Sequence, residues 1–219
     1  PPDMWKEDAF FALRVKQPDR SPRVRLLYLD DDPPQTLSSK HDNAFIYNFP
    51  FLRNVEGIRY RGRFPFAELE YEDRSLPVEV RLKAHSSFIP HNAKDSGLPL
   101  AFFRFTVKNT LNQACETSLM FSMRNLSGYD QDSATLVHRV RKEDGARLLG
   151  MGAEAMDEAS RTAGSTAIGV LGNTESLGHI TAWTSGRGAT EGQAQEWDQS
   201  GGEEPRARER IGFSHAFLP

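Results

Sequence analysis

Two runs of alternating apolar and polar residues constrain the fold more than any other feature of this chain. Residues 78–84 read Val-Glu-Val-Arg-Leu-Lys-Ala, and residues 101–108 place apolar side chains at every second position. A period of two predicts strands with one buried and one solvated face. A third run, residues 117–124, puts Leu119 and Phe121 on one face. We therefore predict that these three strands form one antiparallel sheet.

The segments that join these runs differ in kind. Residues 109–112, Asn-Thr-Leu-Asn, supply turn residues that tolerate left-handed backbone, so we predict a hairpin between the second and third runs. The first and second runs are separated by the loop at residues 88–99, which ends in a proline and has another at its third position. Loops of this length usually have a function or are disordered.

The rest of the chain reads as further short strands. Residues 10–15 and 24–29 predict a hairpin around the Pro-rich turn at 18–22. The composition of residues 153–161 favours a short helix or helical turn. Two later segments, 166–171 and 179–183, alternate as strands and are expected to complete a second sheet. Residues 211–218 alternate as well and are expected to form a closing strand. The predicted fold class is all-β, a single antiparallel β-sandwich domain over residues 1–219 with long loops.

Composition excludes several classes of protein. With 38% hydrophobic and 26% charged residues, the 219-residue chain has enough apolar side chains for a core. A net charge of -3 with mixed signs argues against a nucleic-acid surface. No window approaches the 18 or so apolar residues of a membrane span. The single cysteine, Cys115, has no partner for an intramolecular disulfide and is expected to pack as a small apolar side chain.

The ends and the last long polar segment give weaker information. The chain begins at Pro1 without an initiator Met, which suggests an excised or processed segment. The compartment is undetermined, with a soluble cytoplasmic protein slightly favoured. Residues 186–210 are poor in apolar side chains, and we expect a mobile surface loop there.

Two local features invite a ligand but have simpler interpretations. Asp30, Asp31 and Asp32 are consecutive, so they point in opposite directions in an extended chain and lack the spacing of a calcium loop. Three tyrosines are conceivable parts of a sugar-binding platform: Tyr47, Tyr60 and Tyr71. Because aromatic residues are common in strands and fill sandwich cores, core positions are favoured for them.

The best candidate for catalysis is a cluster of carboxylates. Glu68, Glu70 and Glu72 would share one face of a strand, and glycosidic hydrolysis commonly uses two such groups. That face is more simply the solvated side of an amphipathic strand whose other side carries Ala67 and Leu69. Neither a Gly-x-Ser-x-Gly turn nor a Gly-rich phosphate loop with a following Lys is present. We predict no catalytic residue, no cofactor and no metal in this chain.

Three segments carry a resemblance to a known family. They are FPFAELEYED at residues 64–73, LPVEVRLKAHSSFIPHNAKDSGLPLAFFRFTVKNT at 76–110, and SLMFSMRN at 118–125. Together they resemble the N-terminal region of glycoside hydrolase family 116, which includes non-lysosomal glucosylceramidases and microbial β-glucosidases. The resemblance is continuous from about residue 10 to 124 and weaker beyond.

The resemblance implies that the β-sandwich and the catalytic residues belong to separate domains. It implies a β-sandwich of the glycosidase supersandwich type, followed in the parent by an (α/α)6 barrel that holds the nucleophilic glutamate and the acid/base aspartate. The parent would be a retaining β-glucosidase that acts on β-glucosides or glucosylceramide-like lipids through that barrel. This chain alone is expected to be inactive, with the barrel of the same polypeptide as its partner.

The surface that would meet the barrel is expected at the long loop, because this loop mixes apolar and polar side chains as interfaces do. The candidate contact residues are Phe88, Ile89, Pro90, His91, Asn92, Asp95, Arg124 and Asn125. Two alternatives remain open. One is an independent carbohydrate-binding module with Tyr47, Trp183 and Trp197 as its platform, and the other is a structural domain that oligomerises through a sheet edge.

Overall fold

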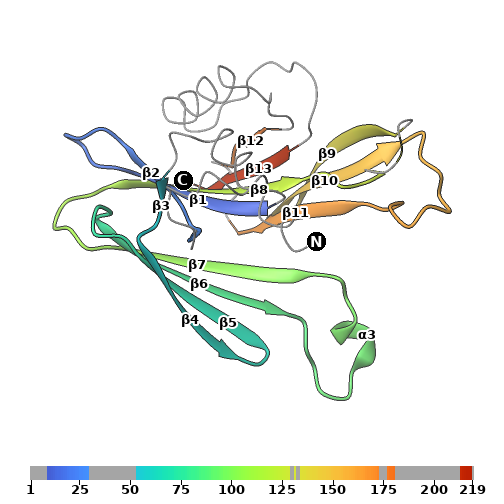
Figure 1. The fold of residues 1–219 in the computed structure, drawn as a ribbon, viewed down its shortest axis with the longest axis horizontal. Coiled ribbons are helices and arrows are strands. Elements are labelled where there is room, and N and C mark those ends of the chain that lie inside the picture. Colours follow the sequence, from blue (N-terminus) through green and yellow to red (C-terminus); the bar gives the residue numbers. More distant parts are fainter. Residues whose placement is uncertain are drawn as a thin grey trace, which may run out of the picture.

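The computed structural model describes residues 9–29, 53–128, 131, 134–172, 177–180 and 213–218. Within them the chain is nearly all β, with three sheets and one helix of four residues, α3 (Ala93–Ser96) (Figure 1). The all-β fold class is confirmed. Asp30 to Asp32, Tyr47, Trp183, Trp197 and the segment 186–210 lie outside the described residues.

The largest sheet has six strands and draws them from both halves of the chain. Its order is β12-β13-β8-β1-β2-β3. The bounds are β1 (Ala9–Lys16), β2 (Arg23–Leu26), β3 (Arg53–Asn54), β8 (Glu116–Arg124), β12 (His179–Ile180) and β13 (Phe213–Leu218). The predicted hairpin of β1 and β2 is confirmed, and only the pairing of β2 with β3 is parallel.

The second sheet is a four-stranded meander. It contains β4 (Gly57–Arg63), β5 (Phe66–Glu72), β6 (Val78–Ser86) and β7 (Ala101–Asn109), in that order. Its inner face carries Leu69, Leu82 and Phe105, which the register places side by side. Charged residues alternate with them on the outer face, as the sequence predicted.

The third sheet, in the order β11-β10-β9, is built from β9 (Thr135–Glu143), β10 (Ala146–Glu154) and β11 (Thr166–Leu171). A two-residue turn joins β9 to β10, with Gly145 at a φ of 67°. Such a left-handed position favours glycine because it has no Cβ. Gly145 therefore allows the chain to reverse between β9 and β10.

Among the described residues, two apolar clusters hold the sheets together. In the larger one, Leu13 and Val15 of β1 pack with Val80 and Leu82 of β6, so the six-stranded and four-stranded sheets face each other as a sandwich. In the smaller one, buried Met151 lies with partly buried residues that include Phe121 of β8. Burying a large aliphatic side chain contributes about 2 kcal/mol, so the sandwich contact dominates the stability of the fold.

The prediction that residues 109–112 form a hairpin is wrong. β7 pairs with β6, whereas β8 pairs with β1 and β13 in the other sheet. The turn residues are used for a crossover instead, and Asn109 Oδ1 accepts a hydrogen bond from Leu111 N at 2.9 Å. The physical reason lies in β8: Met120 and Ser122 on its second face are each 1% exposed, so the strand requires a central position. The three runs consequently do not form one sheet.

Two other expectations are corrected. Residues 153–161 form no helix, since β10 continues to Glu154 and turns follow, among them one with Ser160 N bonded to Asp157 O at 3.0 Å. Pairing of Ala153 and Glu154 with β9 outweighs helix propensity there. Segments 166–171 and 179–183 also do not complete one second sheet, because β11 joins β10 while β12 joins the six-stranded sheet. The predicted closing strand is confirmed as β13.

Candidate interdomain surface

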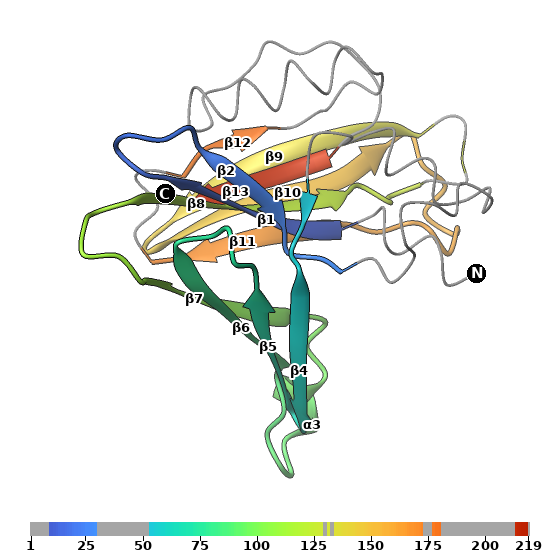
Figure 2. The same ribbon diagram turned by 60° about the vertical axis from the view of Figure 1, so that its left-hand side comes forward.

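The long loop between β6 and β7 lies at the far end of the four-stranded sheet. Both ribbon views place α3 there, away from the other two sheets (Figures 1 and 2). Ser96 Oγ accepts a hydrogen bond from Ile89 N at 2.9 Å and donates one to Ile89 O at 3.1 Å. Asn92 caps α3, since its Oδ1 accepts from Asp95 N at 3.1 Å and its Nδ2 donates to Asp95 Oδ2 at 2.6 Å. The loop is therefore closed by its own polar side chains.

A turn at residues 89–92 presents the apolar side chains of the loop outward. Asn92 N donates to Ile89 O at 3.0 Å, and His91 adopts a φ of 63°. A left-handed φ is uncommon outside glycine but enriched in histidine. Phe88 and Ile89 are 49% and 47% exposed, and Pro90 is exposed as well. Asn92, Asp95 and Ser96 bond within the loop, so its outward surface combines the apolar Phe88, Ile89 and Pro90 with the exposed His91 and Lys94.

The last two candidate contact residues lie at the end of β8. Asn125 is buried, with its Nδ2 bonded to Gly152 O at 2.8 Å and its Oδ1 accepting from Ser127 N at 3.1 Å. It ties the end of β8 to the three-stranded sheet. The backbone of Arg124 pairs with Phe213 of β13, and its side chain lies outside the described residues.

The structure adds an aromatic neighbourhood that the sequence analysis missed. Phe64, in the turn between β4 and β5, is 79% exposed, and its ring meets that of Phe88 edge-on at 4.9 Å between centroids. On the outer face, His85 lies between Phe66 at 5.4 Å and Phe102 at 5.1 Å. Lys83 Nζ lies 4.0 Å from the centroid of the Phe66 ring, as in a cation–π contact. These contacts could not be predicted from the sequence, because they depend on the strand register that aligns the residues on neighbouring strands.

The inner face of the sheet is also uncovered at this end. Phe103 contacts the six-stranded sheet through Phe11 at 5.3 Å and Phe121 at 6.0 Å, and it is already 46% exposed. Further along the same face, Tyr60 is 66% exposed, against the expectation that it fills the core. The four-stranded sheet thus extends beyond the sheet that covers it.

A groove of about 470 Å³ occupies this uncovered end, and Tyr60, Gly62, Phe64 and Ala84 are among its lining residues. A Cβ at Gly62 would lie only 2.6 Å from the Tyr60 hydroxyl, so glycine lets the tyrosine side chain lie across the strand. We call the exposed side chains around this groove the apolar end. Its members are Tyr60, Phe64, Phe88, Ile89, Leu98 and Leu100.

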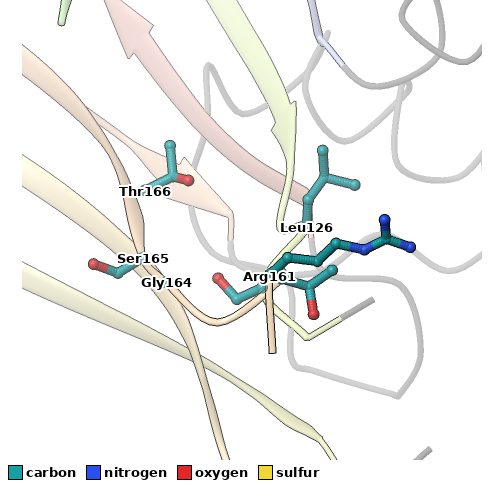
Figure 3. A pocket seen from close by; sticks show the side chains of 7 residues that line it. Leu126, Arg161, Gly164, Ser165 and Thr166 are labelled. Carbon is teal, nitrogen blue, oxygen red and sulfur yellow. The ribbon is translucent and has the colours of Figure 1, made fainter. Parts of the chain in front are cut away.

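A second hollow, of about 460 Å³, lies near the end of β8 and is shown in Figure 3. Arg161, Ser165 and Leu126 are among its lining residues. In the figure the guanidinium group of Arg161 and the hydroxyl of Ser165 point away from each other. A binding site requires polar groups that converge on a ligand, so this hollow is a weaker candidate than the groove.

Among known protein families, the chain matches the one described as beta-glucosidase 2, glycosyl-hydrolase family 116 N-term, over residues 4–204. The chain belongs to this family. The resemblance found in the sequence is therefore confirmed. The matched range ends before β13, although that strand completes the six-stranded sheet.

In this family 116 N-terminal domain, the three glutamates considered for catalysis carry ion pairs on the outer face. Glu70 bonds Arg59 Nη1 at 3.1 Å and lies 3.5 Å from Arg81 Nε. Glu72 also pairs with Arg59, and Glu68 Oε1 lies 3.5 Å from Lys83 Nζ. The interpretation of this face as charged and solvated is confirmed, with Leu69 and Tyr71 on the opposite side.

At the opposite end of β5, the domain is fastened by a buried charge. Asp73 Oδ2 accepts a hydrogen bond from Arg25 Nε of β2 at 2.7 Å, and Ser75 N donates to Asp73 Oδ1 at 2.8 Å. Burial alone would raise the pKa of Asp73, but the hydrogen bonds from Ser75 and Arg25, with the charge of Arg25, outweigh it and lower the pKa. We call this contact between the two facing sheets the Asp73 clasp.

The described residues contain neither a cluster that could hold a metal ion nor a membrane-spanning helix. Among the described residues, no three His, Cys, Asp or Glu side chains are grouped so that they could hold a metal ion. The part of the chain that the structure describes also contains no helix long and apolar enough to cross a membrane.

Proposed function

We propose that this chain is the non-catalytic N-terminal domain of a family 116 enzyme, and that it packs against and supports the catalytic barrel of the same polypeptide. Family membership supports the identity of the domain. The parent reaction, by family, is the retaining hydrolysis of β-glucosides or glucosylceramide-like lipids, and its two carboxyl groups belong to the barrel.

One observation carries the supporting role. The loop that holds Phe88, Ile89 and Pro90 is closed by hydrogen bonds from Asn92 and Ser96 and leaves these three apolar side chains exposed. Exposed apolar clusters on soluble domains commonly mark interaction sites. In the proposal, Phe88, Ile89 and Pro90 supply the apolar contact, while His91, Asn92 and Asp95 give the loop its shape. Arg124 and Asn125 would contribute through the end of β8.

Hydrolysis of a chromogenic β-glucoside tests the proposal. The chain alone is expected to release no product, whereas the full enzyme releases it at a rate that a serine or alanine change in Glu68, Glu70 or Glu72 leaves within about twofold. Turnover by the chain alone, abolished by the same changes, would contradict the proposal and place the chemistry on β5.

A carbohydrate-binding module is the second candidate, and the exposed ring of Tyr60 favours it. Such rings stack on the apolar faces of sugars, and Tyr60 lies across Gly62 at the edge of a groove. Calorimetric titration of the chain with cellobiose decides between the two. Saturable binding that Tyr60→Ala removes would support the module, and no heat at millimolar sugar would remove it.

A further inference from the structure

The exposed apolar side chains of this domain are concentrated at one place. Of the 13 large hydrophobic side chains that are exposed among the described residues, nine lie between residues 60 and 66 or between 88 and 103. The other four, Leu111, Leu136, Val140 and Leu171, are distributed over other elements. The concentration at the apolar end therefore reflects a local property of this surface.

Cations without acidic partners accompany this apolar surface. Residues 60–68 and 83–104 together contain five Lys or Arg and two acids, Glu68 and Asp95. Glu68 pairs with Lys83, and Asp95 is bonded to Asn92. Among the described residues, Arg61, Arg63 and Arg104 have no ion-pair partner. Arg63 lines the groove, and the strand register places all three arginines on the outer face of the meander beside it. A partner that presents carboxylates would complement this rim.

The shape of the groove and the positive charge beside it distinguish between possible partners. A second copy of this chain would bring two positive rims together, which opposes association. A flat anionic bilayer matches the charge but leaves the groove of about 470 Å³ unfilled. A folded protein surface with an apolar projection fills a groove of this size and can place carboxylates opposite the arginines.

We propose that the groove at the apolar end receives an apolar projection of the catalytic domain, and that carboxylates beside this projection pair with Arg61, Arg63 and Arg104. The inference rests on the proposed function and deepens it, because it names the docking surface and the chemistry of the partner. Tyr60 and Phe64 line the groove, and the ring of Phe88 contacts that of Phe64. The Asp73 clasp lies at the other end of β5 and stays outside this contact.

Thiol labelling at introduced cysteines tests the location of the contact. Phe64→Cys is placed at the apolar end, and Leu171→Cys, 71% exposed on the three-stranded sheet, is the matched control. Labelling by a maleimide is compared between this chain and the full enzyme, with the unsubstituted proteins, which contain Cys115, as the background. The rate at Phe64→Cys should fall at least tenfold in the full enzyme, while the rate at Leu171→Cys stays within twofold.

Charge reversal tests the complementary carboxylates. Arg63→Glu and Arg104→Glu in the full enzyme should shorten the half-life of β-glucosidase activity on heating by at least threefold, whereas the exposed control Lys142→Glu leaves it unchanged. Equal half-lives for all three variants would overturn the electrostatic part of the proposal.

The remaining outcomes separate this inference from the proposed function. Equal labelling of Phe64→Cys in both proteins would overturn the docking surface, while an inactive chain within an active enzyme would still support the accessory role. Protection of Phe64→Cys in the chain alone would also overturn the inference. Protection that rises with protein concentration would identify a second copy of the chain as the occupant of the groove. Protection that requires vesicles of phosphatidylserine and phosphatidylcholine would identify a membrane as the partner.

Discussion

Asp73 shows how one residue connects two sheets that the chain forms from distant segments. Its carboxylate accepts hydrogen bonds from Arg25 on β2 and from Ser75 beyond β5. Arg25 Nη2 also donates to Ser75 Oγ at 2.6 Å, so the three side chains form a closed network. Such a network is strong because each polar group finds a partner where water is excluded.

Asp73→Asn should remove an acid-sensitive part of the stability. Because the folded pKa of Asp73 lies below its unfolded value of about 3.9, the carboxylate stabilises the fold above that pH and ceases to do so as the pH falls through the folded pKa. We expect a loss of about 2 kcal/mol at pH 7 that is smaller at pH 3, below the unfolded pKa of about 3.9. Urea unfolding at both pH values measures it, with the exposed Asp144→Asn as control. A constant loss at both pH values would contradict the role of the charge.

Tyr71 gives the opposite dependence at alkaline pH. Burial raises its pKa to about 12, so the neutral hydroxyl is favoured in the folded state. Stability is then complete below the ordinary value of about 10 and falls as the pH rises from 10 to 12, by about 1 kcal/mol at pH 11. Tyr71→Phe should lose less stability between pH 9 and pH 11 than the unchanged chain. A Tyr60→Phe variant that flattens the curve equally would rule this out.

The exposure of Tyr60 is a property that residue patterns cannot predict. Alternation places Tyr60 and Leu69 on the same face of the meander, and the register confirms this placement. Exposure depends instead on where the facing sheet ends, and no local pattern records the length of a distant partner. The same limit concealed the aromatic row of Phe66, His85 and Phe102.

At the scale of elements, the loop between β6 and β7 is held by local bonds. Asn92 caps α3, and Ser96 bonds both backbone groups of Ile89. The double change Asn92→Ala and Ser96→Ala should therefore speed amide hydrogen exchange at Ile89 and Asp95 at least tenfold, while global unfolding changes by less than about 1 kcal/mol. Nuclear magnetic resonance measures the exchange rates of these two amides, and the slowest-exchanging amides of the chain report global unfolding. Unchanged protection would mean that other contacts order the loop.

The strands themselves were largely predictable, whereas some of their pairings were not. The alternation in β6 and β7 indicated their bounds to within about two residues, and these two strands do pair. β8 was also expected as a strand, but its neighbours β1 and β13 are far away in sequence. The buried Met120 and Ser122 on its second face were the available sign that it belongs in the middle of a sheet.

At the scale of the whole molecule, β13 is required beyond the range that defines the family. A chain cut after residue 204 keeps the matched segment but lacks β13, which pairs with β8 from Phe213 to Leu218. The exposed edge of β8 is then open to pairing with other chains. We expect the shortened chain to aggregate at lower protein concentration and to unfold at lower temperature than residues 1–219. Light scattering during a thermal scan measures both, and identical curves would contradict the need for β13.

The two facing sheets differ in how their strands are distributed along the chain. β4 to β7 follow one another between residues 57 and 109, whereas the six-stranded sheet combines β1 with β8 and β13. During synthesis, the ribosome therefore releases a complete meander long before the last strand of the facing sheet. Contacts between neighbours in sequence form fastest, so the meander is expected to fold first. The N-terminal hairpin can then pack on the meander before its later partners β8 and β13 are available. Slow codons or chaperone sites would matter most between residues 109 and 213, while the sandwich is still incomplete.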